Sequence, residues 1–193
     1  MGRTFAEIDE RNAAFIRAQH VFFVATAPRA DDGHLNLSPK GQDSFAILDP
    51  GTVAYLDLTG SGIETVAHLR ENGRIVFMFC AFEGPPRILR LHGRGEVVEP
   101  GDPEWGELLE RFPRQEGVRA IVRARVTRVA DSCGYGVPLY RYQGERSQLR
   151  EWTLRKGGDG LERYQAEHNR ASLDGLPGLR RLAPDLEEET SGV

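Results

Sequence analysis

The stretch that decides the fold is residues 52–81, with the sequence TVAYLDLTGSGIETVAHLRENGRIVFMFCA. It opens with the β-branched and aromatic side chains typical of a strand. A glycine-containing loop follows, in which Ser61 and Glu64 form a capping box and predict the start of a helix. Gly73 is the expected stop of that helix, and the stretch ends in a second run with strand composition. One short helix is therefore inserted between two strands.

Further strands are expected on both sides of this unit. The ranges with strand composition are 20–27, 34–38, 52–58, 74–81, 87–98 and 119–130. Tight turns separate them, with Gly33 and the cluster 49–51 as the clearest examples. Because these short strands precede any long helix, they predict an antiparallel meander rather than alternating βαβ units. Strands in this number, with one helix inserted among them, are expected of a small β-barrel.

Two more helices are expected near the strands. Thr4 and Glu7 form another capping box, which predicts a helix over residues 5–18. Asp102 as cap and Pro103 in the first turn predict a helix with an apolar face between the last two strands.

The C-terminal part of the chain has a different pattern from the strand-rich part. Apolar and aromatic residues recur there at helical spacing, among them Leu149, Trp152 and Tyr164. The acidic end of the chain is expected to be disordered. The predicted organisation is a barrel domain over residues 1–140 and a helical C-terminal extension over residues 141–193.

Composition excludes several classes of function. The formal net charge is −4, which argues against binding to duplex nucleic acid, since that needs a basic face. No apolar run reaches the roughly 18 residues that span a bilayer, and the N-terminus lacks the apolar stretch of a signal peptide. A cytoplasmic protein without membrane contact is therefore expected. Cys80 and Cys133 are too few for a disulfide framework, and the five histidines lack metal-site spacing.

The first candidate site is the stretch Asn36-Leu37-Ser38-Pro39-Lys40-Gly41 at the end of a predicted strand. Strand alternation puts Asn36 and Ser38 on one face, with Lys40 following at the turn. An ammonium group supplies charge and a hydroxyl supplies a directional donor, so the group suits a phosphate. The alternative is a polar strand end followed by a surface turn.

The second candidate site is the loop Thr59-Gly60-Ser61-Gly62 before the inserted helix. Free main-chain N–H groups and the helix dipole favour an anion at such a position. A dinucleotide-binding fingerprint is rejected, because Thr65 stands where the third glycine belongs and the strands do not alternate with helices. The alternative is a capped helix that binds no ligand.

The third candidate site is the strand that begins at Arg87, which is crowded with cationic side chains. Arg90, His92 and Arg94 alternate onto one face, while Leu89 and Leu91 face the core. A flavin, a nucleotide or an acidic substrate lying across this face is one interpretation. A solvated edge strand is the other.

Three motifs in this order resemble the pyridoxamine 5'-phosphate oxidase-like split β-barrels that bind FMN. The motifs lie at residues 36–41, 57–65 and 90–93, and they are similar to those of a branch of candidate oxidases within the family. Residues 131–138 resemble a later segment of the same branch. The likeness covers residues 15–140 and implies an antiparallel split β-barrel.

What the resemblance implies is FMN bound at the interface of a homodimer. The flavin phosphate is expected at the first two motifs, and the arginine-rich strand is expected to approach the flavin. The residues implied to contact the cofactor are Asn36, Ser38, Lys40, Thr59, Gly60, Ser61, Gly62, Thr65, Arg87, Arg90 and His92. Pyridoxamine phosphate oxidases carry an Arg-Lys pair at the start of the inserted helix, where this chain has Glu64 and Thr65. A B6 phosphate is therefore not assigned as the substrate.

The predicted function is that of an FMN-dependent oxidoreductase acting on an unidentified small organic substrate. No side chain is assigned as a catalytic acid or base. One alternative is a reductase that uses the related deazaflavin cofactor. Another is a non-catalytic flavin- or heme-binding protein, with His92 as a heme ligand in the latter case.

Overall fold

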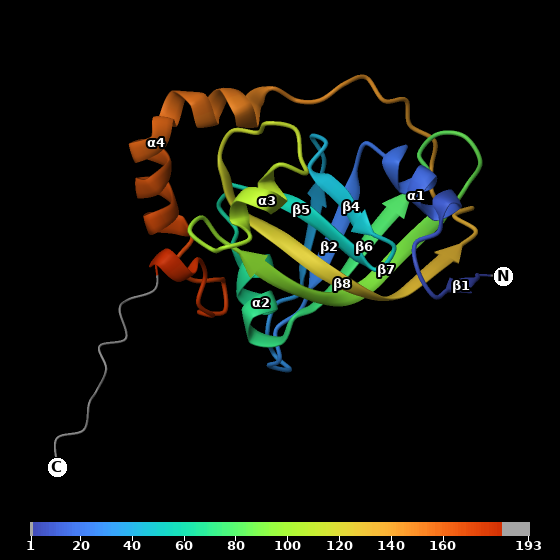
Figure 1. The fold of residues 1–193 in the computed structure, drawn as a ribbon, viewed down its shortest axis with the longest axis horizontal. Helices are drawn as coiled ribbons and strands as arrows, with labels where there is room; N and C mark the ends of the chain where they lie inside the picture. Colours follow the sequence, from blue (N-terminus) through green and yellow to red (C-terminus); the bar gives the residue numbers. More distant parts are fainter. Residues whose placement is uncertain (1, 183–193) are drawn as a thin grey trace, which may run out of the picture.

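The computed structural model describes residues 2–182 (Figure 1). The expected disorder at the end of the chain falls outside these residues. The strands are β1 (Thr4–Phe5), β2 (Phe22–Thr26), β3 (Asn36–Lys40), β4 (Phe45–Asp49), β5 (Thr52–Leu58), β6 (Arg74–Cys80), β7 (Ile88–Val98) and β8 (Val118–Ser132). The helices are α1 (Glu10–Arg17), α2 (Glu64–Asn72), α3 (Trp105–Leu109), α4 (Gln148–His168) and the 3-10 helix η1 (Arg180–Leu182).

All these strands belong to one antiparallel sheet. Its order is β3-β2-β6-β7-β8-β5-β4, with β1 paired to β8. β3 and β4 lie at the two ends of this order, so the strongly curled sheet is not closed into a complete barrel (Figure 1). α2 is inserted between β5 and β6 and lies against β7 and β2. The predicted fold class is confirmed: a mainly β split barrel with an inserted helix and a helical C-terminal tail.

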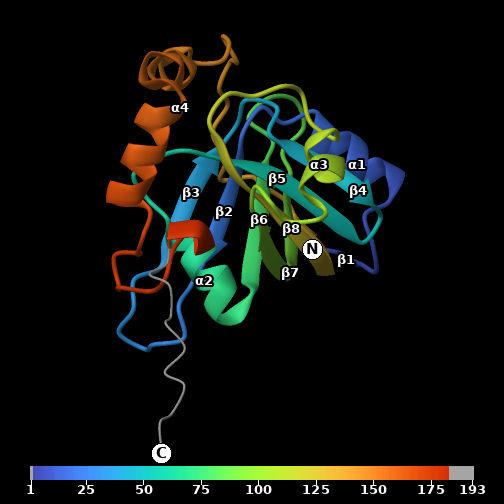
Figure 2. The same cartoon turned by 60° about the vertical axis from the view of Figure 1, so that its left-hand side comes forward.

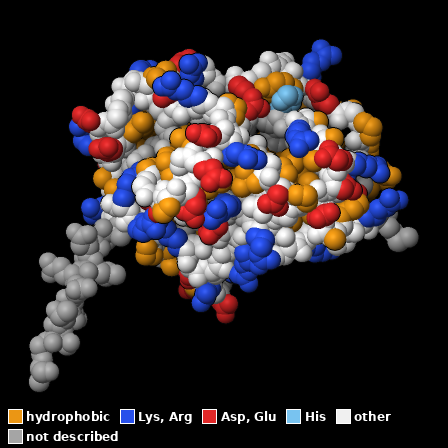
Figure 3. All heavy atoms as spheres, in the orientation of Figure 1, with side chains coloured by type: hydrophobic (Ala, Val, Ile, Leu, Met, Phe, Trp, Pro, Cys, Tyr) orange, Lys and Arg blue, Asp and Glu red, His pale blue; other side chains and the backbone are white. Residues whose placement is uncertain are grey.

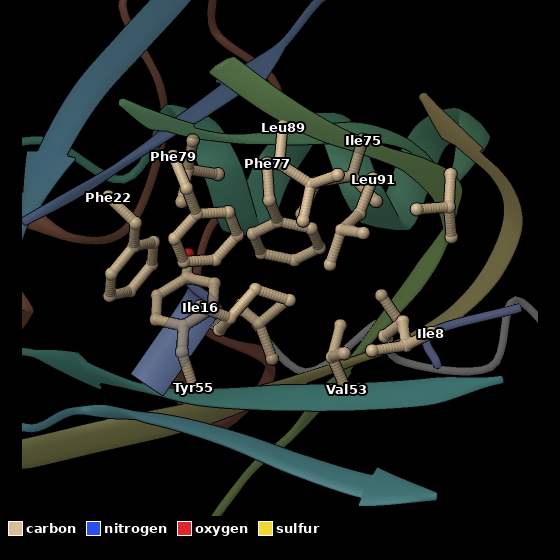
Figure 4. Packing of buried hydrophobic residues seen from close by; sticks show 14 of the residues in the cluster. Ile8, Ile16, Phe22, Val53, Tyr55, Ile75, Phe77, Phe79, Leu89 and Leu91 are labelled. Carbon is tan, nitrogen blue, oxygen red and sulfur yellow. The ribbon is translucent and has the colours of Figure 1, made fainter. Parts of the chain in front are cut away.

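The hydrophobic core lies inside the curled sheet. Alternate residues of the strands point into it, among them Phe22 of β2, Tyr55 of β5 and Phe77 of β6 (Figure 4). The ring centroid of Tyr55 lies 5.7 Å from that of Phe22 and 6.0 Å from that of Phe77. Since strand side chains alternate between faces, neighbouring Phe23 and Met78 lie on the outer face, where they are half-buried.

The first helix begins later than predicted. Thr4 and Phe5 pair with Ala130 and Val129 of β8 as strand β1, so the predicted capping box at Thr4 is wrong. The Asp9 side chain accepts a hydrogen bond from the main-chain N–H of residue 12 and caps α1 instead. Pairing with the sheet outweighs the local capping signal here.

The other two predicted caps are also wrong. The N-cap of α2 is Ile63, which makes no side-chain capping bond, and Ser61 is exposed. The N-cap of α3 is Glu104, whereas Asp102 accepts a hydrogen bond from the main chain of Glu99. The predicted stop of α2 is confirmed, because its C-cap Gly73 adopts the left-handed conformation with φ 68°.

The strand near the first candidate site is shifted by two residues from its predicted range. β3 covers Asn36–Lys40 instead of 34–38, because its register with β2 runs from Thr26 opposite Asn36 to Phe22 opposite Lys40. The pairing makes Lys40 the last residue of the strand rather than part of a turn. β4, which pairs with β5, was not predicted.

The C-terminal extension starts with an irregular segment after β8 and continues into α4 (Figure 2). α4 is bent at Gly157, where φ is 64° and ψ is 177°, a conformation open to glycine. The chain then returns to the barrel and buries Leu179, which packs with Ile63 and Val66. Figure 2 shows this returning segment beside α2 and the β2–β3 hairpin.

Two further observations concern the surface charge and the helices. On the face shown in Figure 3, basic and acidic side chains are intermixed rather than segregated into a basic patch. Among residues 2–182, no helix is both long and apolar enough to cross a membrane.

Candidate functional site

The first two candidate sites come together in one small cavity. It lies between the end of β3, the loop after β5 and the first turn of α2, with a volume of about 240 Å³. The lining residues are Asn36, Ser38, Pro39, Lys40, Leu58, Gly60, Gly62, Glu64, Thr65 and Arg119. We call this cavity the β3–α2 pocket.

A buried carboxylate holds the two cations of the pocket. Nζ of Lys40 lies 2.9 Å from Oδ1 of Asp57, and Nε of Arg119 lies 2.8 Å from Oδ2 of the same residue. The Asp57 and Arg119 side chains are buried, whereas that of Lys40 remains 22% exposed. One negative charge shared by two positive charges leaves this cluster with a net positive charge, which favours an anion.

The pKa of Asp57 reports the strength of this cluster. Burial alone would raise the pKa, but the charges of Arg119 and Lys40 and their hydrogen bonds lower it to about 2. The carboxylate therefore stays ionised at neutral pH.

Arg119 also fixes the loop that precedes α2. Its two terminal nitrogens donate to the carbonyl oxygens of Gly60 (3.1 Å) and Gly62 (2.6 Å). Two loop carbonyls are thus turned toward a buried cation. Among residues 2–182, the main-chain N–H groups of Gly62, Glu64 and Thr65 have no acceptor. Such N–H groups at a helix start are suited to an anion.

The polar side chains of β3 are linked to α2 by hydrogen bonds. Ser38 donates to Oδ1 of Asn36 (3.0 Å), and Nδ2 of Asn36 donates to Oγ1 of Thr65 (2.9 Å) and of Thr26 (3.2 Å). Thr26 in turn lies 2.9 Å from Nδ1 of the buried His68. Burial lowers the pKa of His68. The network positions Ser38 and Thr65 at the pocket, with Asn36 as its centre.

Two of the contact residues predicted for the first two candidate sites do not line this cavity. Thr59 is buried, donates its hydroxyl hydrogen to Gly117 O (2.8 Å) and accepts from Gln165 (2.7 Å). Ser61 is exposed and lies outside the lining set.

The third candidate site is separate from the β3–α2 pocket within one chain. Arg87 lies over the Phe15 ring at 4.7 Å and bonds to Asn12, and Asp131 lies 3.6 Å away. Arg90 donates to Ser132 Oγ at 3.2 Å. Arg87 therefore fastens β7 to α1 and β8.

His92 borders a second cavity, on the outer face of the sheet. This cavity has a volume of about 440 Å³ and also contacts Asn36, Leu37 and Val76. Burial and the nearby charges of Arg128 and Arg90 lower the pKa of His92. Asn36 borders both cavities, so the two candidate regions meet at β3.

Asp57 and Arg119 were missed as site residues by the reasoning from sequence. The signal for Asp57 was its place in the matched motif at residues 57–65. The position of Arg119 could not be read from a motif. Asp57 pairs with Ala120 and Leu58 pairs with Val118, so Arg119 occupies a β-bulge. A bulge re-aims a side chain toward an unexpected face, and no residue pattern predicted it.

Comparison with known proteins shows what this fold is related to. A family profile described as "Pyridoxamine 5'-phosphate oxidase" matches residues 8–133. The chain belongs to this family. Within it, the "Pyridoxamine 5'-phosphate oxidase family protein ustO" of Aspergillus flavus is 41% identical over 189 residues, covering 88% of this chain and 75% of that protein.

Solved structures confirm the fold of this family member. The HupZ protein of Group A Streptococcus matches with a TM-score of 0.51 and 23% identity, over 63% of this chain and 91% of that chain. A candidate pyridoxamine 5'-phosphate oxidase from Lactobacillus delbrueckii matches with a TM-score of 0.50 and 20% identity, over 65% of this chain and 94% of that chain.

Proposed function

We propose that this family member binds FMN with its phosphate in the β3–α2 pocket and works as an oxidoreductase on a small organic substrate. The observation that carries the proposal is that Lys40 and the first turn of α2 line the same cavity. A cation, two hydroxyl groups and helix N–H groups together form the donor set that a phosphate requires.

The donor set of the pocket fits a phosphate group. Lys40 supplies a partly exposed charge, while Ser38 and Thr65 supply hydroxyl groups. Arg119 donates hydrogen bonds to the Gly60 and Gly62 carbonyls. These oxygens are therefore not competing acceptors for the ammonium group of Lys40. Glu64 is the one lining residue whose charge opposes an anion.

Glu64 also bears on the substrate. It stands at the first position of α2, where pyridoxamine phosphate oxidases are expected to carry part of a basic pair. A carboxylate there repels the FMN phosphate itself, so that phosphate must be held by Lys40, Ser38, Thr65 and main-chain N–H groups. Because the basic pair is missing, a B6 phosphate is not proposed as the substrate.

Bound FMN supplies the two-electron redox chemistry, and the protein supplies its position and its electrostatic surroundings. Lys40, Ser38 and Thr65 hold the phosphate, and the Asn36 network keeps the two hydroxyl groups in place. Arg90 and His92 face outward from the sheet. Across an interface, Arg90 would contribute positive charge near a flavin and His92 would contribute hydrogen-bond capacity.

A homodimer completes this proposal. The outer face of β3, β2 and β6 carries Leu37, Phe23, Val76 and Met78, and Leu37 is 65% exposed. A contiguous apolar face of this kind marks an interaction surface, and a twofold dimer is its most economical cover. Two such faces packed together would also bring Arg90 and His92 of each chain toward its partner.

The first test of the proposal is the identity of the purified cofactor. The protein is purified, denatured and filtered, and the released small molecule is identified by absorption and mass spectrometry. FMN is the expected result. A deazaflavin would favour the alternative reductase, heme would favour the alternative heme-binding protein, and riboflavin alone would contradict the phosphate site.

A further inference from the structure

We propose that residues 165–174 act as a clamp that holds the β3–α2 pocket in its phosphate-binding geometry. The clamp rests on the proposed function of this pocket. Its residues line no part of the pocket, yet they contact the glycine loop, the first turn of α2 and His34, which lies two residues before β3. They also lie outside residues 8–133, the part matched by the family profile. The clamp thus lies in the C-terminal extension, beyond the part of the chain that the profile matches.

The first contact of the clamp is with the glycine loop. Nδ2 of Asn169 donates to the carbonyl oxygen of Gly60 at 2.9 Å, and Nε2 of Gln165 donates to Oγ1 of Thr59 at 2.7 Å. Asn169 and Gln165 are both buried. Because Arg119 also donates to the Gly60 carbonyl, that peptide is held from two sides. Because the peptide is planar, this also fixes the direction of the N–H of Ser61.

The second and third contacts are with the segment that leads into β3 and with α2. Asp174 accepts hydrogen bonds from the main-chain N–H of His34 (2.8 Å) and from its Nδ1 (2.6 Å), just before β3 begins. The N–H of Leu173 points to Oε1 of Glu64 at 3.3 Å. The carboxylate of Glu64, whose charge opposes an anion in the pocket, thus accepts a hydrogen bond from the clamp.

The clamp also has anchoring contacts to the barrel beyond the pocket. Oε1 of Gln165 accepts from Arg181, and Arg181 donates to the buried Glu99 at 3.3 Å. The main-chain N–H of Arg180 donates to the same carboxylate at 2.8 Å. Leu179 is fully buried between these contacts. A segment fixed at this end can hold the pocket walls at the other.

The predicted effect of the clamp is specific for the phosphate. Holding donors in their bound arrangement before the ligand arrives reduces the ordering cost of binding. In the proposed binding mode only the phosphate would occupy the β3–α2 pocket, so riboflavin should gain nothing from the clamp. A role confined to general stability would change both affinities together.

The test compares Asp174→Ala and Asn169→Ala with the control Glu162→Ala in the full chain. Asp174 and Glu162 are both acidic residues at the surface, so the two substitutions change the net charge equally. Loss of a negative charge alone would strengthen FMN binding, so a weaker affinity in Asp174→Ala is opposite to the charge effect. The dissociation constants of FMN and riboflavin are measured by quenching of flavin fluorescence.

We expect FMN to bind about three- to tenfold more weakly in both variants, the scale of one or two lost hydrogen bonds. Riboflavin should bind all proteins about equally, and Glu162→Ala should match the wild type. Equal loss for both ligands, or no loss in Asp174→Ala, would overturn the clamp. If the wild type itself binds FMN no better than riboflavin, the proposed phosphate site fails, and the clamp fails with it. Because Asp174 lies at the surface, its variant still decides the question if Asn169→Ala does not fold.

Discussion

The ammonium group of Lys40 lies 2.9 Å from a carboxylate oxygen of Asp57, a residue with no exposed surface. Lys40 is therefore oriented before any ligand binds. The carboxylate also neutralises part of the Lys40 charge. Because Arg119 shares the same carboxylate, the three side chains together keep a net positive charge. The phosphate affinity of the pocket thus depends on three residues from three strands rather than on Lys40 alone.

Replacement of Lys40 by alanine is expected to weaken FMN binding by about 1.5–3 kcal/mol, the scale of a charge-assisted hydrogen bond. Riboflavin affinity should change little. Titration of both flavins against the purified variant measures the effect. Lys156→Ala is the matched control, because it removes the same charge from an exposed position on α4. Equal FMN affinity in the two variants would rule out Lys40 as a phosphate ligand.

Replacement of Arg119 by methionine is expected to lower the free energy of unfolding by about 3 kcal/mol, since it breaks a buried ion pair. It also frees the Gly60 and Gly62 carbonyls, so FMN affinity should fall even where the protein is folded. Urea unfolding and flavin titration measure the two effects. Arg125→Met serves as a control at an exposed position of the same strand. An unfolding free energy unchanged from wild type would contradict the anchoring role.

Acid should destabilise the protein through Asp57. Its pKa is about 2 in the folded chain and about 3.9 in an unfolded chain. A lowered folded-state pKa contributes stability that is present above the unfolded pKa and is lost as the pH falls from about 4 to about 2. The expected loss is about 2 kcal/mol. Urea unfolding across this pH window should show the loss in wild type and a smaller slope in Asp57→Asn. Equal slopes would mean that other groups govern the acid response.

Replacement of Leu37 by glutamate is expected to give a monomer with weaker flavin retention, because it places a charge in the proposed dimer face. Light scattering should show a wild-type mass of about twice 21.5 kDa and a variant mass of one chain. Leu154→Glu is the control, since Leu154 is similarly exposed but belongs to α4 rather than to the sheet. A wild-type protein that is monomeric and still retains FMN would refute the shared-interface geometry.

Most of the fold followed from residue patterns, because alternation and turn residues act locally. The strand ranges at residues 52–58 and 74–81 and the C-cap at Gly73 are examples. Helix starts were less predictable. Thr4 was predicted to cap a helix but pairs with β8 instead. Ser61 was predicted to cap α2 but does not, although Glu64 is the first residue of that helix. Such outcomes depend on tertiary contacts that a local pattern does not contain.

The candidate site was predicted in part. Lys40, Ser38 and the glycine loop were expected to hold one ligand, and the structure brings them into one cavity. The position of Arg119 depends on a bulge in β8, and the position of Asn169 depends on how the chain returns after α4. Both contacts join residues more than fifty positions apart. Long-range geometry of this kind is not encoded in any single motif.

The most direct test of the phosphate site is the ratio of the riboflavin and FMN dissociation constants of the wild-type protein. The two ligands share the ring and the sugar chain and differ only in the phosphate. A phosphate held by Lys40, Ser38 and the start of α2 should make FMN bind at least about tenfold more tightly, which corresponds to about 1.4 kcal/mol. Equal affinities would show that no phosphate contact is made and would contradict the proposed site.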